Sequence, residues 1–563
     1  MNDIFFSLML LGALSGGTGQ PLPYWATANQ WGLMPENQGY MTLVQARTEF
    51  DAARTLQLRW GASLAANEYA NNLDPGSMPL HIMADELYGS LRWKAFTLDL
   101  GIKHRELGFY GADARLGSLS TTGGHVAESG NARAMPGYLL SLDPVAIPWT
   151  GRHVWLYGAY GDYKPLGPNY VEDPLVHRTR IGFRFDIGSR LRLNFLLDHY
   201  AIWGGTIPNK VTMPVTLENY FRVVTGRHAS SEGTWSDRLN VIGDQGGGEL
   251  WGAEYLGDGW RVVFQHDIPY ADGSGMGFQN FPDGVTTLHF SWNDKSRWIS
   301  DLLYEHTYTM YQSGPFNGEQ FDAEGHSITP PGVKTTGGDN YFNNSEYRSG
   351  WTSYGRPIGT PLMYPVGTRA GTWTGAVMVQ GLENTRLKAH HFALSGKLFR
   401  QHPYKLMLTY SSNHGTYGRP YAGESAWNKE WGSVAETPLR QLSAAFTGSV
   451  LLRPGALRPG ALRSGASGRG SHPTASGARP ASSDSGSLTA SGSRSAASGS
   501  RGSSGNAGSL SASGARPAGS ASSSRSSSGR RPFEASLLYG IYADRGSVLP
   551  DTFGFTLGAR LSF

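Results

Sequence analysis

The last eleven residues, 553–563, alternate between large apolar side chains and small or polar ones. Apolar residues take every second position, and Thr556, Gly558 and Arg560 are among the residues between them. In a β-strand this period of two places the apolar row on one face and the polar row on the other. A strand of about ten such residues is long enough to cross a bilayer at a tilt. The segment therefore predicts a membrane-crossing strand.

The same alternation recurs along the chain. Apolar runs at 87–93 and 96–102 flank Lys94-Ala95, and runs at 181–187 and 191–197 flank Gly188-Ser189. Two-residue turns between such runs indicate β-hairpins. Together with 4–14 and the last strand, the pattern predicts eighteen strands. The remaining, weaker runs lie at about 40–50, 55–67, 137–149, 154–162, 251–256, 260–268, 284–293, 298–309, 387–400, 404–412, 440–452 and 533–543.

The connections between these strands alternate between short and long. Outer-membrane barrels have short periplasmic turns, long outer loops and usually an even strand number, whereas a soluble sandwich has no reason to sort its loops in this way. We therefore predict an all-β fold: a transmembrane antiparallel β-barrel of about 18 strands, with long extracellular loops that partly fill the lumen. The short connections are 51–54, 94–95, 150–153, 188–189, 257–259, 294–297 and 401–403.

The apolar segment 4–14 has two interpretations. One is the apolar region of a secretory signal, although Asp3 precedes it without any Lys or Arg. The other is the first barrel strand, which the strand count favours.

Composition supports an all-β membrane protein. The chain has 563 residues, 76 Gly and 12% aromatic residues, and no window holds the eighteen or more apolar residues of a membrane-spanning helix. Frequent Gly and aromatic residues without long helical periodicity favour many turns and strands. The chain has no Cys, which excludes disulfides, thiolate metal sites and a cysteine nucleophile.

The net charge of +4 hides an uneven distribution. Eleven Arg and a single acid, Asp484, lie within 453–531, so this segment carries +10 and the rest of the chain −6. The segment is almost wholly Ser, Gly, Ala, Arg and Pro, and we predict a disordered periplasmic insertion between barrel residues 1–452 and a closing hairpin at 532–563. It is either a neutral low-complexity insertion, which we favour, or an Arg-rich tether to anionic lipid, lipopolysaccharide or cell-wall polymer. The mildly acidic remainder predicts no nucleic-acid partner.

Catalytic motifs are missing from the sequence. It contains no HExxH, GxSxG or Walker A pattern. His390 and His391 are adjacent in a predicted strand, so they face opposite sides and cannot chelate one ion together. Asp301 and Glu305 share a strand face, which a polar lumen explains. We therefore expect no enzyme activity, no cofactor and no metal.

The predicted outer loops are dense in aromatic, amide and charged residues. Sugars need flat apolar surfaces for their C–H faces and fixed donors and acceptors for their hydroxyls. Arg adds a planar fork suited to uronic carboxylates. The other interpretation is that these side chains fold the loops inward and plug the lumen, or form interface girdles. The carbohydrate-binding candidates are Trp25, Trp31, Asn131, Arg133, Asp339, Asn340, Tyr341, Trp351, Tyr354 and Arg356.

At these motifs the chain resembles the Wzi-type capsule-assembly proteins of Bacteroidetes-like bacteria. The resemblance implies an eighteen-stranded outer-membrane barrel that acts as a lectin and helps to hold capsular polysaccharide on the cell surface, without catalysis. The insertion at 453–531 departs from the family pattern. The matching stretches include PYWATANQWGL (23–33), SGNARAMP (129–136), HDIPYADGSG (266–275), LLYEHTYTMYQSG (302–314), GGDNYFNNSEYRSGWTSYGRPIGTPLM (337–363) and KAHHFALSGKL (388–398).

The sequence therefore predicts a bacterial outer-membrane barrel that binds capsular or other surface polysaccharide non-covalently through its outer loops. Its expected partners are this polysaccharide, outer-membrane lipid and lipopolysaccharide, and we expect a monomer. The alternative function is an outer-membrane porin or transporter for small solutes, because an eighteen-stranded barrel is wide enough for an aqueous lumen.

Overall fold

A computed structural model describes most of the chain. The chain divides into two compact units, Met1–Arg453 with Gly514–Phe563, and Pro454–Ser513. The second unit and the predicted insertion 453–531 lie outside the described residues, all of which belong to the first unit. The described residues are 4–16, 21–51, 53–69, 80–104, 118–208, 211–228, 241–271, 278–314, 338–368, 381–421, 437–452 and 533–563.

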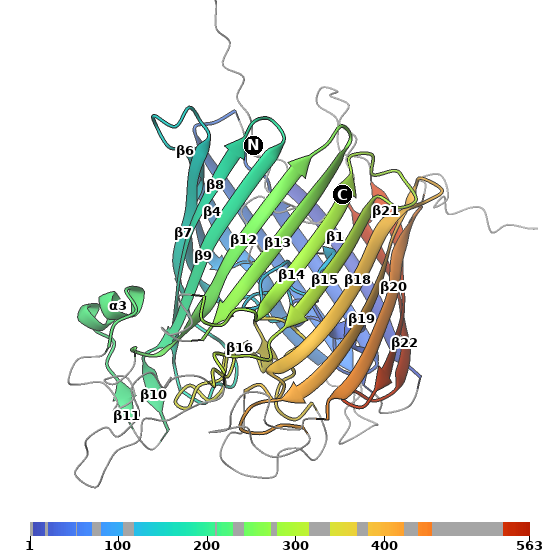
Figure 1. Cartoon of the computed structure of the whole chain (residues 1–563). Coiled ribbons are helices and arrows are strands. Elements are labelled where there is room, and N and C mark those ends of the chain that lie inside the picture. Colours follow the sequence, from blue (N-terminus) through green and yellow to red (C-terminus); the bar gives the residue numbers. More distant parts are fainter. Residues whose placement is uncertain are drawn as a thin grey trace, which may run out of the picture. The chain divides into compact units, whose positions relative to one another are not determined.

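The first unit is a closed antiparallel barrel of eighteen strands, as the sequence predicted (Figure 1). Each strand pairs with its neighbours in chain order, and β1 closes the ring by pairing with both β2 and β22. The strands are β1 (Ile4–Ser15), β2 (Gly39–Thr48), β3 (Leu56–Tyr69), β4 (Leu80–Trp93), β5 (Phe96–Ile102), β6 (Pro136–Ala146), β7 (Val154–Tyr163), β8 (Leu175–Ile187), β9 (Leu191–Trp203), β12 (Asp244–Leu256), β13 (Trp260–Tyr270), β14 (Gly284–Trp292), β15 (Asp301–Tyr308), β18 (Arg386–Leu398), β19 (His402–Gly415), β20 (Leu439–Leu452), β21 (Glu534–Gly546) and β22 (Thr552–Ser562).

Alternation along each strand separates an apolar exterior from a polar interior. In β22, Phe555 and Leu557 are exposed, whereas Thr556 between them is buried. In β8, Ile181 is exposed on the outside, whereas Arg178 is buried on the inside. A closed barrel satisfies every strand edge, and an outer apolar band faces hydrocarbon. The protein is therefore an outer-membrane β-barrel.

The connections alternate between tight and long, as the sequence predicted, except that residues 453–533 separate β20 from β21 where the alternation places a tight turn. Figure 1 shows the tight turns at one rim, where β22 also ends. One of these turns, Lys94-Ala95, joins β4 to β5. The opposite rim carries the long connections, among them 103–135 and 309–385. This sorting places the long connections on the extracellular side of an outer-membrane barrel.

Among the strands that extend further toward the long-loop rim than the alternation predicted, three are consecutive neighbours in the barrel. β8 begins at Leu175 rather than 181, β9 continues to Trp203 rather than 197, and β12 begins at Asp244 rather than 251. At this rim Ala201 and Trp203 pack under Val223 of helix α3 (Leu217–Val224), which covers the barrel wall from outside. Because both faces of these strand ends are buried, the alternation of exposed and buried residues is lost there.

Smaller elements lie in the long connections. They are α1 (Tyr24–Thr27), the hairpin β10 (Gly205–Ile207) and β11 (Val211–Met213), and the hairpin β16 (Thr352–Ser353) and β17 (Arg356–Pro357). Of the described helices, none has the length and hydropathy to cross a membrane.

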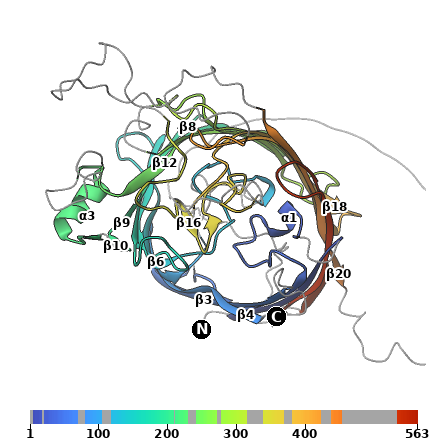
Figure 2. The same cartoon turned by 90° about the horizontal axis from the view of Figure 1, so that it is seen from below.

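Loop segments fill part of the lumen, which confirms that element of the predicted fold. Figure 2 shows α1 and β16 inside the ring of strands. Three segments meet there: 21–38, 118–135 and 338–368, which together we call the plug. The backbone N–H of Trp31 donates to the carbonyl of Gly130 at 2.7 Å, and that of Ser129 donates to the carbonyl of Ile358 at 2.8 Å. The hydrophobic core of the protein therefore lies inside the barrel, with Trp25, Val126 and Tyr341 among its buried members.

Candidate functional site

Four of the ten carbohydrate-binding candidates lie together, although they are far apart in sequence. Trp31, Arg133, Tyr354 and Arg356 come from the three plug segments, and all four are only partly buried. The guanidinium of Arg133 lies over the ring of Tyr354, 4.0 Å from its centroid. Gly32 sits between the two arginines: a Cβ there would lie 2.9 Å from Cγ of Arg133 and 3.5 Å from Cδ of Arg356. We call these four residues the aromatic–arginine surface.

The turn of the β16–β17 hairpin presents Tyr354. Tyr354 and Gly355 both have positive φ, at 52° and 74°, and Gly355 is exposed. Two consecutive residues with positive φ form the tight turns that match the twist of a two-residue hairpin. The turn therefore holds the Tyr354 ring beside Arg133 at the tip of a short, fixed element.

Each arginine of this surface is anchored to the protein through Nη2. Nη2 of Arg133 donates to the carbonyl of Ala84 at 3.1 Å. Nη2 of Arg356 donates to the carbonyl of Met34 at 3.4 Å and lies 3.7 Å from Oε1 of Glu36. Burial lowers the pKa of Arg356, and the charge of Glu36 opposes this effect. A guanidinium has five N–H donors, so planar forks remain for a ligand.

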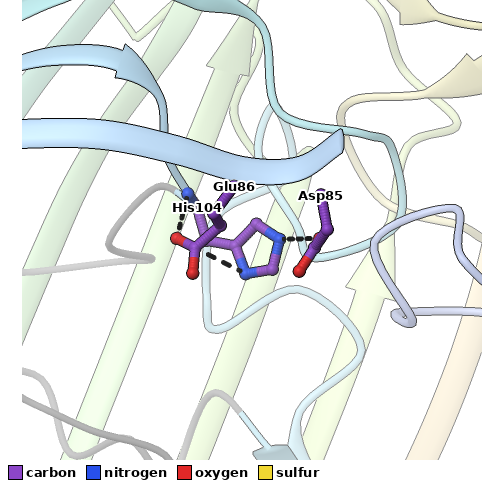
Figure 3. A group of neighbouring side chains, drawn as sticks. All are labelled: Asp85, Glu86 and His104. Carbon is purple, nitrogen blue, oxygen red and sulfur yellow. Dashed lines mark hydrogen bonds and ion pairs between the residues drawn. The ribbon is translucent and has the colours of Figure 1, made fainter. Parts of the chain in front are cut away.

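Trp31 joins this surface to a cluster of titratable groups. Its indole stacks on the imidazole of His104, with ring centroids 4.1 Å apart and an interplanar angle of 5°. Figure 3 shows His104 between two carboxylates: Nε2 lies 2.6 Å from Oδ1 of Asp85, and the backbone N–H donates to Oε1 of Glu86 at 2.9 Å. Candidate ligand atoms of these three residues, which we call the His104 cluster, lie within 4.8 Å of one another, a geometry that can hold a metal ion.

A β-bulge in β4 brings the two carboxylates to one side. Ser63 opposes Glu86 and Leu64 opposes Ala84, so Asp85 is an extra residue. Ile82 and Leu87 both face outward despite their odd spacing. The bulge reverses the alternation, and therefore the adjacent Asp85 and Glu86 both point inward. A period of two predicts opposite faces for adjacent residues, so the sequence pattern missed this cluster.

The other six candidates are mostly buried and make contacts within the protein. Trp25, Asn131, Asp339, Tyr341 and Trp351 are at most 8% exposed. Nε1 of Trp351 donates to the carbonyl of Ala127 at 2.7 Å, and Nε1 of Trp25 donates to Oγ1 of Thr409 at 3.1 Å. These side chains hold the plug together and against the wall.

The amide and hydroxyl groups among these six are likewise engaged. The Tyr341 hydroxyl donates to Asp283 at 2.8 Å. Asn131 Nδ2 donates to the carbonyl of Pro357 at 3.2 Å, and Asp339 Oδ2 accepts from Asn280 at 3.0 Å. Asn340 is partly buried, and its Oδ1 accepts from Thr385 at 2.9 Å.

A buried ionic network fastens the plug to β8, β9 and β13. Glu128 makes a two-point ion pair with Arg178, both contacts at 2.6 Å, and also pairs with Arg180. Burial alone would raise the pKa of Glu128, but the two guanidinium groups lower it to about 2. Removing one member of such a network leaves a buried charge without its counterion, which is strongly destabilising.

His125 forms the second part of this fastening. Nε2 lies 2.7 Å from Asp198 on β9, and Nδ1 lies 3.1 Å from Asp267 on β13. Burial alone would lower the pKa of His125, but the two carboxylates raise it to about 9. The sequence did not single out this network, because its members come from separate loops and strands.

Most of the histidines and carboxylates that the sequence analysis considered make hydrogen bonds within the protein. His391 is buried, and its Nε2 lies 2.6 Å from the carbonyl oxygen of Leu119, whereas His390 faces outward. Glu305 accepts hydrogen bonds from Ser120 and Thr121 of the plug. Asp301 accepts one from Lys295 at 2.8 Å.

Comparison with solved structures finds β-barrels. No protein-family profile and no curated protein matches the chain. The chain is similar to Escherichia coli Wzi, which is described as an outer membrane protein involved in group 1 capsule assembly and as a carbohydrate-binding β-barrel. The two chains share 12% identity, the comparison covers 100% of this chain and 84% of Wzi, and the TM-score is 0.46. It is also similar to Pseudomonas aeruginosa OpdL (8% identity, 100% and 98% covered, TM-score 0.40) and to Acinetobacter baumannii OccAB2 (9% identity, 100% and 97% covered, TM-score 0.39). At these identities the likeness concerns the fold alone.

Proposed function

We propose that this barrel binds an acidic surface polysaccharide, such as a capsular polymer, through the aromatic–arginine surface. The observation that carries the proposal is the meeting of Trp31, Arg133, Tyr354 and Arg356, which are partly exposed and held in fixed positions by the plug. The motif resemblance to Wzi-type capsule-assembly proteins supports the same function.

The surface combines the two chemistries that sugar binding needs. Arg133 covers one face of the Tyr354 ring and His104 one face of the Trp31 indole, and the exposed parts of both rings offer apolar surface for sugar C–H groups. The guanidinium groups of Arg133 and Arg356 offer planar donors that match a uronic carboxylate. A long polymer that engages many barrels is retained by avidity even if each site is weak. The function requires no reaction, and we propose a binding protein rather than an enzyme.

Direct binding of oligosaccharides to the refolded full chain tests the proposal. We expect acidic capsular oligosaccharides to bind the native protein, and the Tyr354→Ala variant to bind them at least several-fold more weakly. Tyr421→Ala is the matched control, because Tyr421 is also a half-buried loop tyrosine but lies in the connection after β19 and bonds to Glu383, outside the aromatic–arginine surface. Equal binding by native protein and Tyr354→Ala, with the barrel intact by circular dichroism, would rule out this surface.

A diffusion channel for small solutes is the second candidate function. An eighteen-stranded barrel encloses enough space for an aqueous lumen, which favours it. The plug segments occupy part of that lumen. Single-channel recording separates the two functions: a large, steady conductance of the native protein would favour the channel, and a silent barrel that binds polysaccharide would favour the first proposal.

A further inference from the structure

We propose that the His104 cluster is a binding site for a divalent transition-metal ion, with Zn²⁺ as the probe. Imidazole nitrogen and carboxylate oxygen are the ligands that Zn²⁺ takes in proteins. The cluster offers one imidazole, from His104, and two carboxylates, from Asp85 and Glu86. Three protein ligands leave a further coordination position, on the side where His104 and Glu86 are 23% and 20% exposed.

The charges of the cluster also favour a cation as its ligand. Some inward carboxylates pair with a Lys or Arg, such as Asp99 with Lys103 at 2.6 Å and Asp301 with Lys295 at 2.8 Å. Within the part of the chain that the structure describes, Asp85 and Glu86 pair with no Lys or Arg and share one imidazole. Two adjacent carboxylates with so little compensation attract a cation.

Contacts with neighbouring side chains fix the orientation of the His104 and Asp85 side chains. Trp31 stacks on the face of His104 and fixes the plane of the imidazole. Oδ2 of Asp85 accepts a hydrogen bond from Ser63 at 2.8 Å, which leaves Oδ1 directed at His104. Such supporting contacts orient metal ligands and raise metal affinity. The bulge that directs both carboxylates inward interrupts the strand pairing, which is a further cost that a binding site explains.

Isothermal titration of the detergent-solubilised full chain with Zn²⁺ tests the proposal. We expect His104→Gln and Asp85→Asn each to weaken one site at least roughly tenfold, the size seen when metal ligation is disturbed. His153→Gln, which removes an exposed imidazole at a tight turn, is the control and should bind like the native protein. The proposal is overturned if native protein and His104→Gln bind Zn²⁺ with the same affinity and stoichiometry while circular dichroism shows an intact barrel.

A different observation carries a second proposal: we propose that helix α3 rests on the outer leaflet of the membrane. α3 lies outside the ring of strands in both views (Figures 1 and 2). Its Tyr220 hydroxyl donates to Asp162 of β7 at 2.8 Å and lies 2.5 Å from the hydroxyl of Tyr160, and Val223 is fully buried against the wall. The helix is therefore docked on the barrel exterior.

The surface of α3 divides into three sectors. Asn219, Tyr220 and Val223 face the barrel. Glu218 and Arg222 form a polar sector and pair with each other at 2.8 Å. Between these sectors Leu217 and Phe221 are 78% and 64% exposed, one helical turn apart. An amphipathic helix with a bare apolar stripe beside a charged one is typical of the membrane interface.

The height of α3 on the barrel fits this position. On the outer face of β8, Ile187, Phe185 and Ile181 are exposed to lipid. Farther toward the long-loop rim, His177 and Leu175 are instead covered by α3. On β8, the helix thus begins to cover the barrel wall where the lipid-facing band ends. In this proposal Leu217 and Phe221 contact the lipid at the boundary between the acyl chains and the headgroups.

Single spin labels test this proposal, and the absence of Cys from the chain makes each introduced thiol unique. The protein is reconstituted in vesicles of phosphatidylethanolamine and phosphatidylglycerol. We expect a label at Phe221→Cys to collide mainly with dissolved oxygen, which concentrates in lipid. The Glu218→Cys control should collide mainly with a water-soluble nickel complex. Leu217→Cys repeats the first measurement in case one label disturbs the helix. Equal access of the nickel complex to all three positions would overturn the proposal.

Discussion

The indole of Trp351 lies flat on the ring of Tyr200, with centroids 3.8 Å apart and an interplanar angle of 8°. Tyr200 belongs to the barrel wall and Trp351 to the plug, so this pair joins the two. Trp351 is 4% exposed, whereas Tyr354, three residues later, is partly exposed. Two neighbouring aromatic residues therefore have separate roles: Trp351 packs the plug, and Tyr354 belongs to the surface proposed to bind sugar.

Replacing Trp351 with Ala should loosen the plug. Removal of a buried Trp costs about 3–5 kcal/mol, and the carbonyl of Ala127 loses its donor. We expect a lower midpoint of thermal unfolding and a higher single-channel conductance than in the native protein. Trp149→Ala is the control, because Trp149 is 90% exposed at a tight turn. An unchanged conductance together with an unchanged midpoint would contradict the packing role.

Replacing Arg133 should distinguish charge from geometry in sugar binding. Arg133→Lys keeps the charge but loses the planar fork, and Arg133→Ala loses both. If a carboxylate is bound by the fork, both variants bind acidic oligosaccharide several-fold more weakly, with Arg133→Ala the weaker. Binding of neutral oligosaccharide should change less. The readout is the ratio of the affinity for acidic oligosaccharide to the affinity for neutral oligosaccharide. A native-like ratio in Arg133→Ala would argue against a carboxylate contact there.

The His125 contacts predict a loss of stability in alkali. Its pKa is raised from 6.5 to about 9, so the protonated form is favoured in the folded plug. The contribution is complete below about pH 6.5 and disappears as the pH rises through about 9. It amounts to at most about 3–4 kcal/mol, because one pKa unit corresponds to about 1.4 kcal/mol.

Thermal unfolding between pH 6 and pH 10 measures this effect. The native protein should lose stability across this range more steeply than His125→Gln, in which the titrating group is absent. His153→Gln, at an exposed tight turn, should keep the native pH dependence. Parallel curves for native protein and His125→Gln would show that the contacts of His125 do not contribute in this way.

The lipid-facing side chains of β22 predict which substitutions destabilise the inserted barrel. Leu557 is 63% exposed in a closed barrel, so its neighbour is lipid. Leu557→Arg should destabilise the inserted barrel by about 2–4 kcal/mol near the bilayer midplane, whereas Leu557→Ala should cost less. Equilibrium unfolding from lipid vesicles provides the measurement. Equal stabilities of the two variants would place this side chain outside the hydrocarbon.

The strands could be predicted from the sequence because one physical rule acts on each of them locally. A barrel wall has lipid on one side, so the outward positions must be apolar, as in the alternation from Phe553 to Phe563. The rule stops where the surroundings change. At Trp203 the outside of β9 is covered by α3, and at Asp85 a bulge reverses the alternation, so neither the strand end nor the His104 cluster follows from the period of two.

The sequence by itself determined the strand number, the sorting of the connections and the loop segments rich in aromatic and amide residues. Only the tertiary structure decided which of those residues are buried and which meet: it buries Trp25, Tyr341 and Trp351 in the plug and brings Trp31, Arg133, Tyr354 and Arg356 to one surface. The physical reason is that alternation is a property of neighbours along the chain, whereas the packing of three loops inside a barrel depends on contacts between residues hundreds of positions apart.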